Sequence, residues 1–218
     1  MVCMDLTAKI CGLRTPETLH AAIEAGADWV GFVFFPKSPR HVSLDEAKAL
    51  GIRVAGRAKK VALLVDAPDS MIADVIAALQ PDFLQLHGHE TPERVSEIKQ
   101  LFGLPLIKAL GIADHDDLIR GRAYENVVDW MLYDAKPPKQ AALPGGNGVS
   151  FDWALLKDAG KQHHFMLSGG LDVDNVANAL AITGAAGVDV SSGVESAPGI
   201  KDPKRIKAFM ARVRQSAL

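Results

Sequence analysis

Short apolar runs alternate with longer amphipathic runs along the whole chain of 218 residues, and this alternation limits the fold more than any other feature. Five of the seven steps between the starts of successive apolar runs are 22 to 24 residues long. The runs that predict strands begin near Thr7, Trp29, Lys60, Phe83, Pro105, Asp129, His164 and Gly187. Helical patterns cover Glu17–Ala25, Leu44–Leu50, Ser70–Leu79, Glu93–Leu101, Val173–Ala181 and Pro203–Gln215.

Each predicted strand is followed by enough chain to return across a parallel sheet. Eight such units indicate an α/β protein, either a single (β/α)8 TIM barrel with a parallel eight-stranded core or a doubly wound open sheet. No G-x-G-x-x-G follows the first strand, which disfavours the dinucleotide-binding open sheet. No linker or low-complexity tract divides residues 1–218, so we expect a single TIM-barrel domain.

Two of the predicted strands are followed by unusually long segments. The surplus lies in Phe35–His41 and Ala135–Gly148. Barrel enzymes build their active sites from the loops that follow strands, and long loops in a compact domain are usually functional. The sequence therefore places the candidate site at this end of the barrel.

The seventh and eighth predicted strands both run into turns of serine and glycine. These are Ser168-Gly169-Gly170 and Ser191-Ser192-Gly193. Such turns can aim several backbone N–H groups at one phosphate, and barrels commonly bind phosphate after strands seven and eight. The plainer interpretation is that glycine-rich turns merely end the strands.

The composition excludes several classes of partner. Lys and Arg number 24 against 26 Asp and Glu, so no basic excess predicts binding to nucleic acid or to an anionic membrane. No apolar run is long enough to span a bilayer. The first nine residues lack the layout of a signal peptide, and Cys3 and Cys11 do not suggest a disulfide framework, which favours a reduced, cytoplasmic protein.

Cys11 and Asp134 are the candidate proton-transfer residues, since each ends a predicted strand at the expected active face. A thiolate can act as a base or a nucleophile, and a protonated carboxyl can act as a general acid. The alternatives are a small buried core residue for Cys11 and a cap or an ion-pair partner of Lys136 for Asp134.

Other polar residues also fall near strand ends. Arg40, in the proline-flanked second loop, suits a planar carboxylate, although most loop arginines are simply solvated. His87 ends the fourth strand, where it either orients a substrate or a neighbour or has only a structural role. Lys9 points into the barrel on the same face as Cys11, with Asp189 as a candidate partner. No grouping of His, Asp or Glu has metal-ligand spacing, so we expect no metal.

Six of these segments in this order resemble the phosphoribosylanthranilate isomerase family over about residues 9–209. The segments are Lys9-Ile10-Cys11-Gly12, Gly31-Phe32-Val33-Phe34 with Ser38-Pro39-Arg40, Leu84-Gln85-Leu86-His87-Gly88, Asp134 with Gly145-Gly146-Asn147-Gly148, Ser168-Gly169-Gly170-Leu171 and Asp189-Val190-Ser191-Ser192-Gly193-Val194-Glu195.

The resemblance implies a cofactor-independent Amadori rearrangement of N-(5-phosphoribosyl)anthranilate in tryptophan biosynthesis. It implies that Cys11 is the general base and Asp134 the general acid. It also implies that Arg40 binds the anthranilate carboxylate and that the phosphate lies on the turns at Gly169-Gly170 and Ser192-Gly193. We expect Arg40 to lie far from the phosphate turns, because the second strand is well around the barrel from the seventh and eighth.

The sequence departs from the family pattern in the sixth loop and beside the candidate acid. Many members have Thr where this chain has Asn147, and Pro137-Pro138 stiffens the loop. Tyr133 is bulkier than the usual aliphatic residue, and we expect it to point away from Asp134. These departures predict a change in the loop rather than loss of activity.

Other functions remain as alternatives. A metal-dependent epimerase of phosphorylated sugars would need ligands that the first three strands do not supply. A catalytically silent phosphate-binding barrel would lack the acid or the base, and a bifunctional isomerase would pair carboxylates rather than use Cys11. The expected partner is a small phosphorylated substrate, and the chain is expected to be a monomer or a homodimer.

Overall fold

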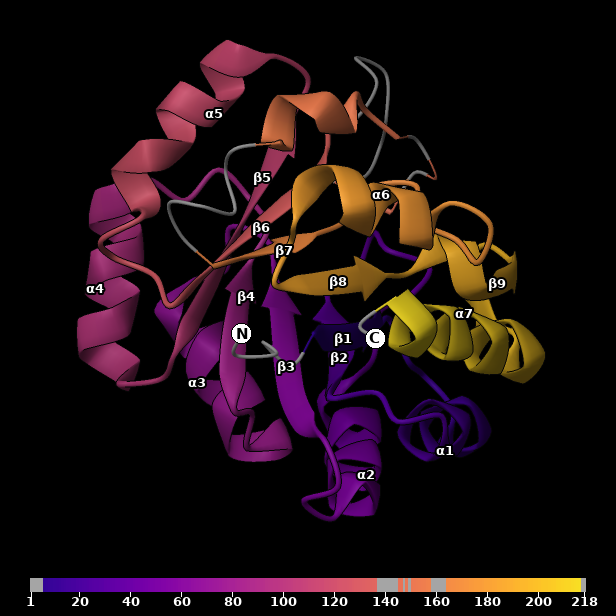
Figure 1. Ribbon diagram of the computed structural model, residues 1–218. Coiled ribbons are helices and arrows are strands. Elements are labelled where there is room, and N and C mark those ends of the chain that lie inside the picture. The colour runs from indigo at the N-terminus through magenta and orange to yellow at the C-terminus, as the bar shows by residue number, and fades with distance from the viewer. Residues whose placement is uncertain (1–5, 137–144, 147, 149, 158–163, 217–218) are drawn as a thin grey trace.

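Eight parallel strands form a closed barrel with helices around its outside (Figure 1). The computed structural model describes residues 6–136, 145–146, 148, 150–157 and 164–216. The strands are β1 (Thr7–Cys11), β2 (Trp29–Phe34), β3 (Lys59–Leu64), β4 (Phe83–Leu86), β5 (Leu106–Ile112), β6 (Trp130–Ala135), β7 (Phe165–Leu167) and β8 (Gly187–Val190). Each strand starts within one residue of its predicted start, and the prediction of a TIM barrel is confirmed.

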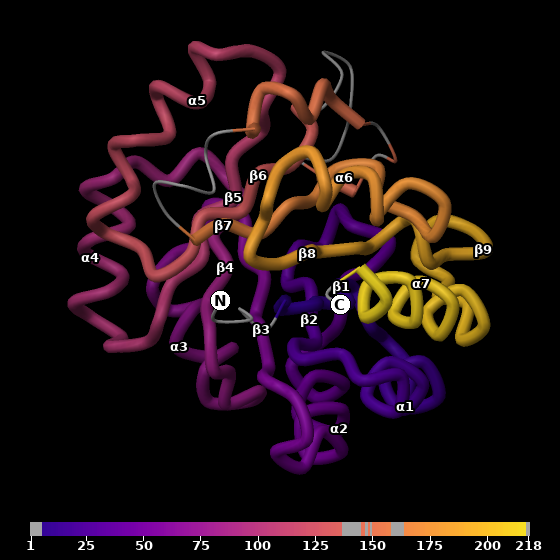
Figure 2. The backbone as a smooth tube through the Cα atoms, in the orientation of Figure 1, coloured from indigo at the N-terminus to yellow at the C-terminus, as the bar shows by residue number. Residues whose placement is uncertain are grey.

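Closure of the barrel brings the two ends of the chain together. β1 pairs in parallel with both β2 and β8, and Figure 2 shows the indigo start of the chain beside the orange β8. In the β1–β8 register Lys9 is level with Asp189. The first and last helices, α1 (Pro16–Glu24) and α7 (Pro203–Ser216), also pack side by side (Figure 1).

Several helices begin at residues whose side chains cap the helix N-terminus. In α1 the Thr15 hydroxyl accepts a hydrogen bond from the N–H of Thr18. Ser43 and Glu46 form a reciprocal capping box at the start of α2 (Leu44–Val54). The other predicted helices appear as α3 (Asp69–Leu79), α4 (Pro92–Phe102) and α6 (Val176–Thr183).

Several short elements have no clear sequence signal. They are α5 (His115–Gly121), the 3-10 turns η1 (Arg122–Tyr124), η2 (Trp153–Leu156) and η4 (Ser192–Val194), and the strands β9 (Glu195–Ala197) and β10 (Ile200–Lys201). The strands β9 and β10 pair as an antiparallel ribbon directly after β8. This ribbon brings Lys201 beside Glu195, close to the carboxyl-terminal end of β8.

The core has an outer layer between the barrel and its helices and an inner layer within the barrel. Alternate residues along each strand divide between the two layers, so Ala8 and Ile10 pack outward while Lys9 and Cys11 point inward. Tyr133 packs with Phe165 in the outer layer, away from Asp134, as expected.

Aromatic rings fill the amino-terminal end of the barrel. Trp29 stacks on Phe83 with 4.4 Å between ring centroids and meets Trp130 edge-on at 5.3 Å. The polar side chains of the barrel interior lie towards its carboxyl-terminal end, where the predicted site is.

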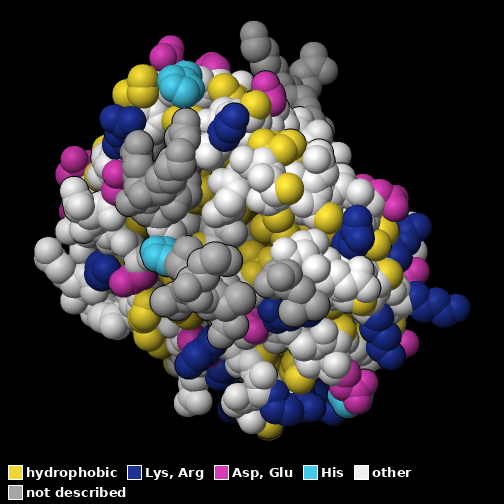
Figure 3. All heavy atoms as spheres, viewed as in Figure 1, with side chains coloured by type: hydrophobic (Ala, Val, Ile, Leu, Met, Phe, Trp, Pro, Cys, Tyr) yellow, Lys and Arg dark blue, Asp and Glu magenta, His cyan; other side chains and the backbone are white. Residues whose placement is uncertain are grey.

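Acidic and basic side chains are interspersed on the face seen in Figure 3, and apolar side chains gather over β8 and α6. This mixture fits the formal charge of −2. Within the described ranges, no helix is long and apolar enough to cross a membrane.

Candidate active site

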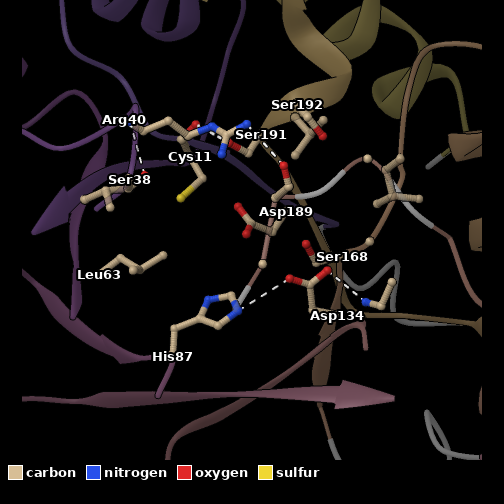
Figure 4. A pocket seen from close by; sticks show the side chains of 18 of the residues that line it. Cys11, Ser38, Arg40, Leu63, His87, Asp134, Ser168, Asp189, Ser191 and Ser192 are labelled. Carbon is tan, nitrogen blue, oxygen red and sulfur yellow. Dashed lines mark hydrogen bonds and ion pairs between the residues drawn. The ribbon is translucent and has the colours of Figure 1, made fainter. Parts of the chain in front are cut away.

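A pocket opens at the carboxyl-terminal end of the barrel and is lined by residues from every strand end except that of β5 (Figure 4). Nine of the ten predicted site residues line it, and the tenth, Gly193, lies just behind Ser192. The nine are Cys11, Arg40, His87, Asp134, Gly169, Gly170, Asp189, Ser191 and Ser192. The side chains of Cys11 and Asp134 face this pocket from opposite sides (Figure 4).

Cys11 has a buried lysine beside it. The Lys9 ammonium donates a 2.9 Å hydrogen bond to Asp189, which confirms the predicted pair. Gly31 makes room for this arrangement, because a Cβ there would lie 3.0 Å from Cys11 Sγ and 3.1 Å from Lys9 Nζ. Burial raises the pKa of the Cys11 thiol above its usual value, and the charges of Lys9 and Lys201 act in the opposite direction.

Lys9 itself stays protonated in this interior. Burial alone would lower its pKa, but the charges of Asp189 and Cys11 outweigh burial and raise the pKa above its usual value. A cation is therefore fixed next to the thiol, where its charge offsets part of the effect of burial on the pKa of Cys11.

Asp134 is held by a backbone donor and by a histidine. Its Oδ1 accepts a 2.8 Å hydrogen bond from the N–H of Ala135, and its Oδ2 lies 3.4 Å from Nε2 of His87 (Figure 4). Lys136 pairs instead with Asp117 at 2.9 Å, so the suggested Asp134–Lys136 ion pair is wrong. The carboxyl group of Asp134 is consequently directed into the pocket.

Gly145 covers the His87–Asp134 pair. A Cβ at this position would lie 2.6 Å from Asp134 Oδ2 and 2.7 Å from His87 Nε2. Only a residue without a side chain permits so close an approach of the backbone.

Arg40 reaches the strand-eight side of the barrel. Its Nε and Nη2 donate to the two carboxylate oxygens of Glu195 at 2.7 and 2.8 Å, and Nη2 also donates to the carbonyl of Gly146 at 3.2 Å. The expectation that Arg40 lies far from the phosphate turns is therefore wrong. The barrel is closed, so only β1 separates β2 from β8, and a long side chain spans that distance.

Glu195 joins Arg40 to Lys201 in a buried network. Lys201 Nζ donates to Glu195 at 2.6 Å and to the carbonyl and hydroxyl oxygens of Ser191 at 2.9 and 3.0 Å. The Ser191 hydroxyl in turn lies 3.2 Å from the carbonyl oxygen of Cys11. The network thus connects the second loop, the strand-eight turn and the end of β1.

Burial and hydrogen bonding together shift the pKa values of Glu195 and Lys201 in this network. It would raise the pKa of Glu195, but hydrogen bonds from Arg40 and Lys201 outweigh it and lower the pKa below its usual value. Burial lowers the pKa of Lys201 to about 8, in spite of its contact with Glu195.

The two glycine-rich turns pack directly against their neighbours. Gly169 and Gly170 have φ angles of 87° and 66°, a region that favours glycine. A Cβ on Gly193 would lie 1.9 Å from the carbonyl oxygen of Leu171, so the turn after β8 rests on the turn after β7. This contact brings the predicted phosphate-binding segments together.

Sequence reasoning gave no role to four residues of the site: Gln85, Gly145, Glu195 and Lys201. Glu195 and Gly145 lay within quoted motifs, and Gln85 shares an inward face with His87. Lys201 had no signal, since only the β9–β10 ribbon brings it beside Glu195 and Ser191. Asn147, Pro137-Pro138 and Cys3 lie outside the described residues. Over the described part of the chain, no three His, Cys, Asp or Glu side chains are grouped to hold a metal ion.

Comparison with known proteins adds to this geometry. Residues 8–212 match the family model for N-(5'-phosphoribosyl)anthranilate (PRA) isomerase. The chain is 56% identical over 213 residues to the N-(5'-phosphoribosyl)anthranilate isomerase of Rhodopseudomonas palustris strain BisB5, covering 98% of each chain.

Two solved structures share the fold. One contains monomers generated from the dimeric phosphoribosylanthranilate isomerase of Thermotoga maritima, with a TM-score of 0.84, 33% identity and coverage of 96% of this chain and 99% of that one. The other is a phosphoribosylanthranilate isomerase in complex with reduced 1-(o-carboxyphenylamino)-1-deoxyribulose 5-phosphate, with a TM-score of 0.85, 33% identity and the same coverage.

Proposed function

Since the chain belongs to the phosphoribosylanthranilate isomerase family, isomerases of tryptophan biosynthesis, we propose that it catalyses the family's Amadori rearrangement with Asp134 as acid and Cys11 as base. The substrate is N-(5-phosphoribosyl)anthranilate, and the product is 1-(2-carboxyphenylamino)-1-deoxyribulose 5-phosphate. The observation that carries the assignment is that Asp134 and Cys11 face one pocket from β6 and β1, which lie three strands apart around the barrel.

The first step is opening of the ribose ring. Asp134 gives its proton to the ring oxygen, the bond from that oxygen to the first ribose carbon breaks, and the anthranilate nitrogen lone pair forms a C=N bond. Asp134 is left as a carboxylate, which the Ala135 N–H and His87 are placed to stabilise.

The second step is removal of the proton from the second ribose carbon. The Cys11 thiolate takes this proton, and the electron pair moves into the carbon–carbon bond and neutralises the iminium nitrogen. The resulting enamine tautomerises to the ketone. Lys9 supports this role, because a buried ammonium beside the sulfur favours its anionic form.

Binding is divided between two anion sites. The turns at Gly169-Gly170 and Ser191-Ser192-Gly193 take the phosphate, and Arg40 takes the anthranilate carboxylate. Asp189 contributes by holding Lys9. Glu195 orients Arg40, since it accepts hydrogen bonds from two of the three guanidinium nitrogens.

The proposal also covers the domain organisation, the oligomeric state, the cellular location and the cofactor requirement. Residues 1–218 act as one barrel domain, as a monomer or a homodimer, in the cytoplasm. The reaction needs no metal or other cofactor, because one acid and one base suffice for both steps.

The purified protein tests the proposal directly with freshly prepared phosphoribosylanthranilate, whose fluorescence falls as it is consumed. Wild type should turn it over. Cys11→Ala and Asp134→Asn should each lower kcat by about 10²–10⁴ with little change in KM, because each removes a proton-transfer group.

Asp74→Asn is the matched control, since Asp74 is exposed on α3, and it should behave as wild type. Absence of turnover by wild type would favour a silent phosphate-binding barrel. Loss of turnover on chelation, restored by a divalent ion, would favour the epimerase alternative. Near-normal kcat in either catalytic variant would remove that residue from the mechanism.

A further inference from the structure

Gln85 carries a fully buried amide in the barrel interior, and among the described residues its side chain has a hydrogen-bonding contact only with His87. Its neighbours Leu84 and Leu86 pack into the outer layer, so Gln85 points inward on the same face as His87. Nε2 of Gln85 lies 3.3 Å from Nδ1 of His87. Its Oε1 has no hydrogen-bond partner among the described residues. A buried polar atom without a partner is destabilising, so an amide at this position calls for a reason.

The contact with Gln85 determines which nitrogen of His87 carries the proton. A neutral imidazole has one nitrogen that donates and one that accepts. With the NH2 group of Gln85 turned towards His87, as it lies here, Nδ1 is the acceptor and Nε2 of a neutral ring carries the hydrogen. That Nε2 is the atom 3.4 Å from Asp134 Oδ2. His87 therefore donates to Asp134 rather than accepting from it.

We propose that Gln85 is a positioning residue that fixes His87 as the Nε2–H tautomer, so that His87 cannot accept the proton that Asp134 delivers to the substrate. This inference rests on the acid role proposed for Asp134. In the other tautomer the Nε2 lone pair would face Asp134 and accept a hydrogen bond from its O–H, which would turn the acid proton away from the ring oxygen.

The same tautomer also helps after the proton has left. Asp134 is then an anion, and the Nε2–H of His87 donates to its Oδ2 while the Ala135 N–H donates to Oδ1. Gly145 lies directly over the pair, where any side chain would collide with Oδ2 and Nε2. His87 thus lies between Gln85, Asp134 and Gly145, and each of its two ring nitrogens has a partner.

Two-bond proton–nitrogen correlation spectra of the full-length enzyme, labelled with 15N-histidine, read the tautomer directly. Loss of one set of signals in His87→Asn assigns His87 among the seven histidines. In wild type we expect His87 to be protonated on Nε2 and not on Nδ1. Gln85→Glu is nearly isosteric and presents only acceptors when ionised, so it should place a proton on Nδ1.

The kinetic consequence should fall on kcat. We expect Gln85→Glu and Gln85→Leu to lower kcat by about ten- to a hundredfold, by analogy with loss of the hydrogen-bond partner of a metal-bound histidine, with little change in KM. Ile107→Leu is the packing control, because Ile107 pairs with Gln85 across β4 and β5. It should change neither the His87 tautomer nor kcat.

Protonation of wild-type His87 on Nδ1 would overturn the proposal. So would a Gln85→Glu variant that keeps both the wild-type tautomer and the wild-type kcat. The spectra need no substrate, so failure of wild type to turn over phosphoribosylanthranilate would count against the proposed function and leave the tautomer measurement standing.

Discussion

Replacing Glu195 by Gln should destabilise the whole barrel, because Glu195 is the one carboxylate between two buried cations of the described network. It accepts from Arg40 at 2.7 and 2.8 Å, from Lys201 at 2.6 Å and from the N–H of Gly199 at 3.2 Å. An amide removes the negative charge and turns one acceptor into a donor that faces other donors. Removing one partner of a buried ion pair costs about 3–5 kcal/mol.

This loss is large against the total stability of a domain. For a chain of this length 1 kcal/mol shifts Tm by about 2–4 °C, so Tm should fall by about 6–20 °C. Thermal and urea unfolding followed by circular dichroism measure the change. Glu97→Gln is the matched control, since the Glu97 side chain is 67% exposed and its pair with Arg94 contributes about 0–1 kcal/mol. Lys201→Met in the Glu195→Gln background should recover part of the loss.

The stabilisation that Glu195 provides depends on pH. The pKa of Glu195 is lower in the folded protein than its ordinary value of 4.5, so the folded state binds this proton less readily than the unfolded state. Its stabilisation is therefore complete above about pH 4.5 and is lost as the pH falls through the folded pKa. The difference in Tm between wild type and Glu195→Gln should become smaller as the pH falls below 4.5. A Tm for Glu195→Gln within 2 °C of the Glu97→Gln value at neutral pH, a difference of about 1 kcal/mol or less, would refute the reasoning.

Three further outcomes are expected. Arg40→Ala should raise KM about ten- to a hundredfold through loss of a charge-assisted contact of roughly 1.5–3 kcal/mol, and it should also lower Tm because Glu195 loses its bidentate partner; an unchanged Tm would contradict the buried pairing. Gly193→Ala should raise KM and weaken inhibition by inorganic phosphate, since its Cβ would lie 1.9 Å from the Leu171 carbonyl; wild-type phosphate inhibition would show that the turn can move freely. The thiolate absorbance at about 240 nm that distinguishes wild type from Cys11→Ser should develop only as the pH increases beyond 9.0, because burial raises the pKa of the Cys11 thiol above that usual value; a difference absorbance already complete below pH 9.0 would contradict the raised pKa.

The sequence determined the order of the elements and the end of the barrel that carries the pocket. Strand starts were predicted to within one residue because buried parallel strands are short apolar runs separated by amphipathic helices. Cys11 and Asp134 could be predicted to share one pocket because both end such runs, and parallel strands have their carboxyl ends at one edge. Short elements such as α5 were not predicted, because seven residues are too few to show a helical periodicity.

Tertiary structure alone decided the partners of the polar side chains that lie beyond the strands. Arg40 pairs with a glutamate 155 positions away, and Lys136 pairs with Asp117 instead of Asp134. Local periodicity fixes which face of a strand a side chain occupies, so Gln85 and His87 are predictably neighbours. The pairing of a side chain with a distant loop depends instead on barrel closure and on how far the side chain reaches. A buried charge must find a partner within hydrogen-bonding distance, and only the folded chain determines which partners lie that close.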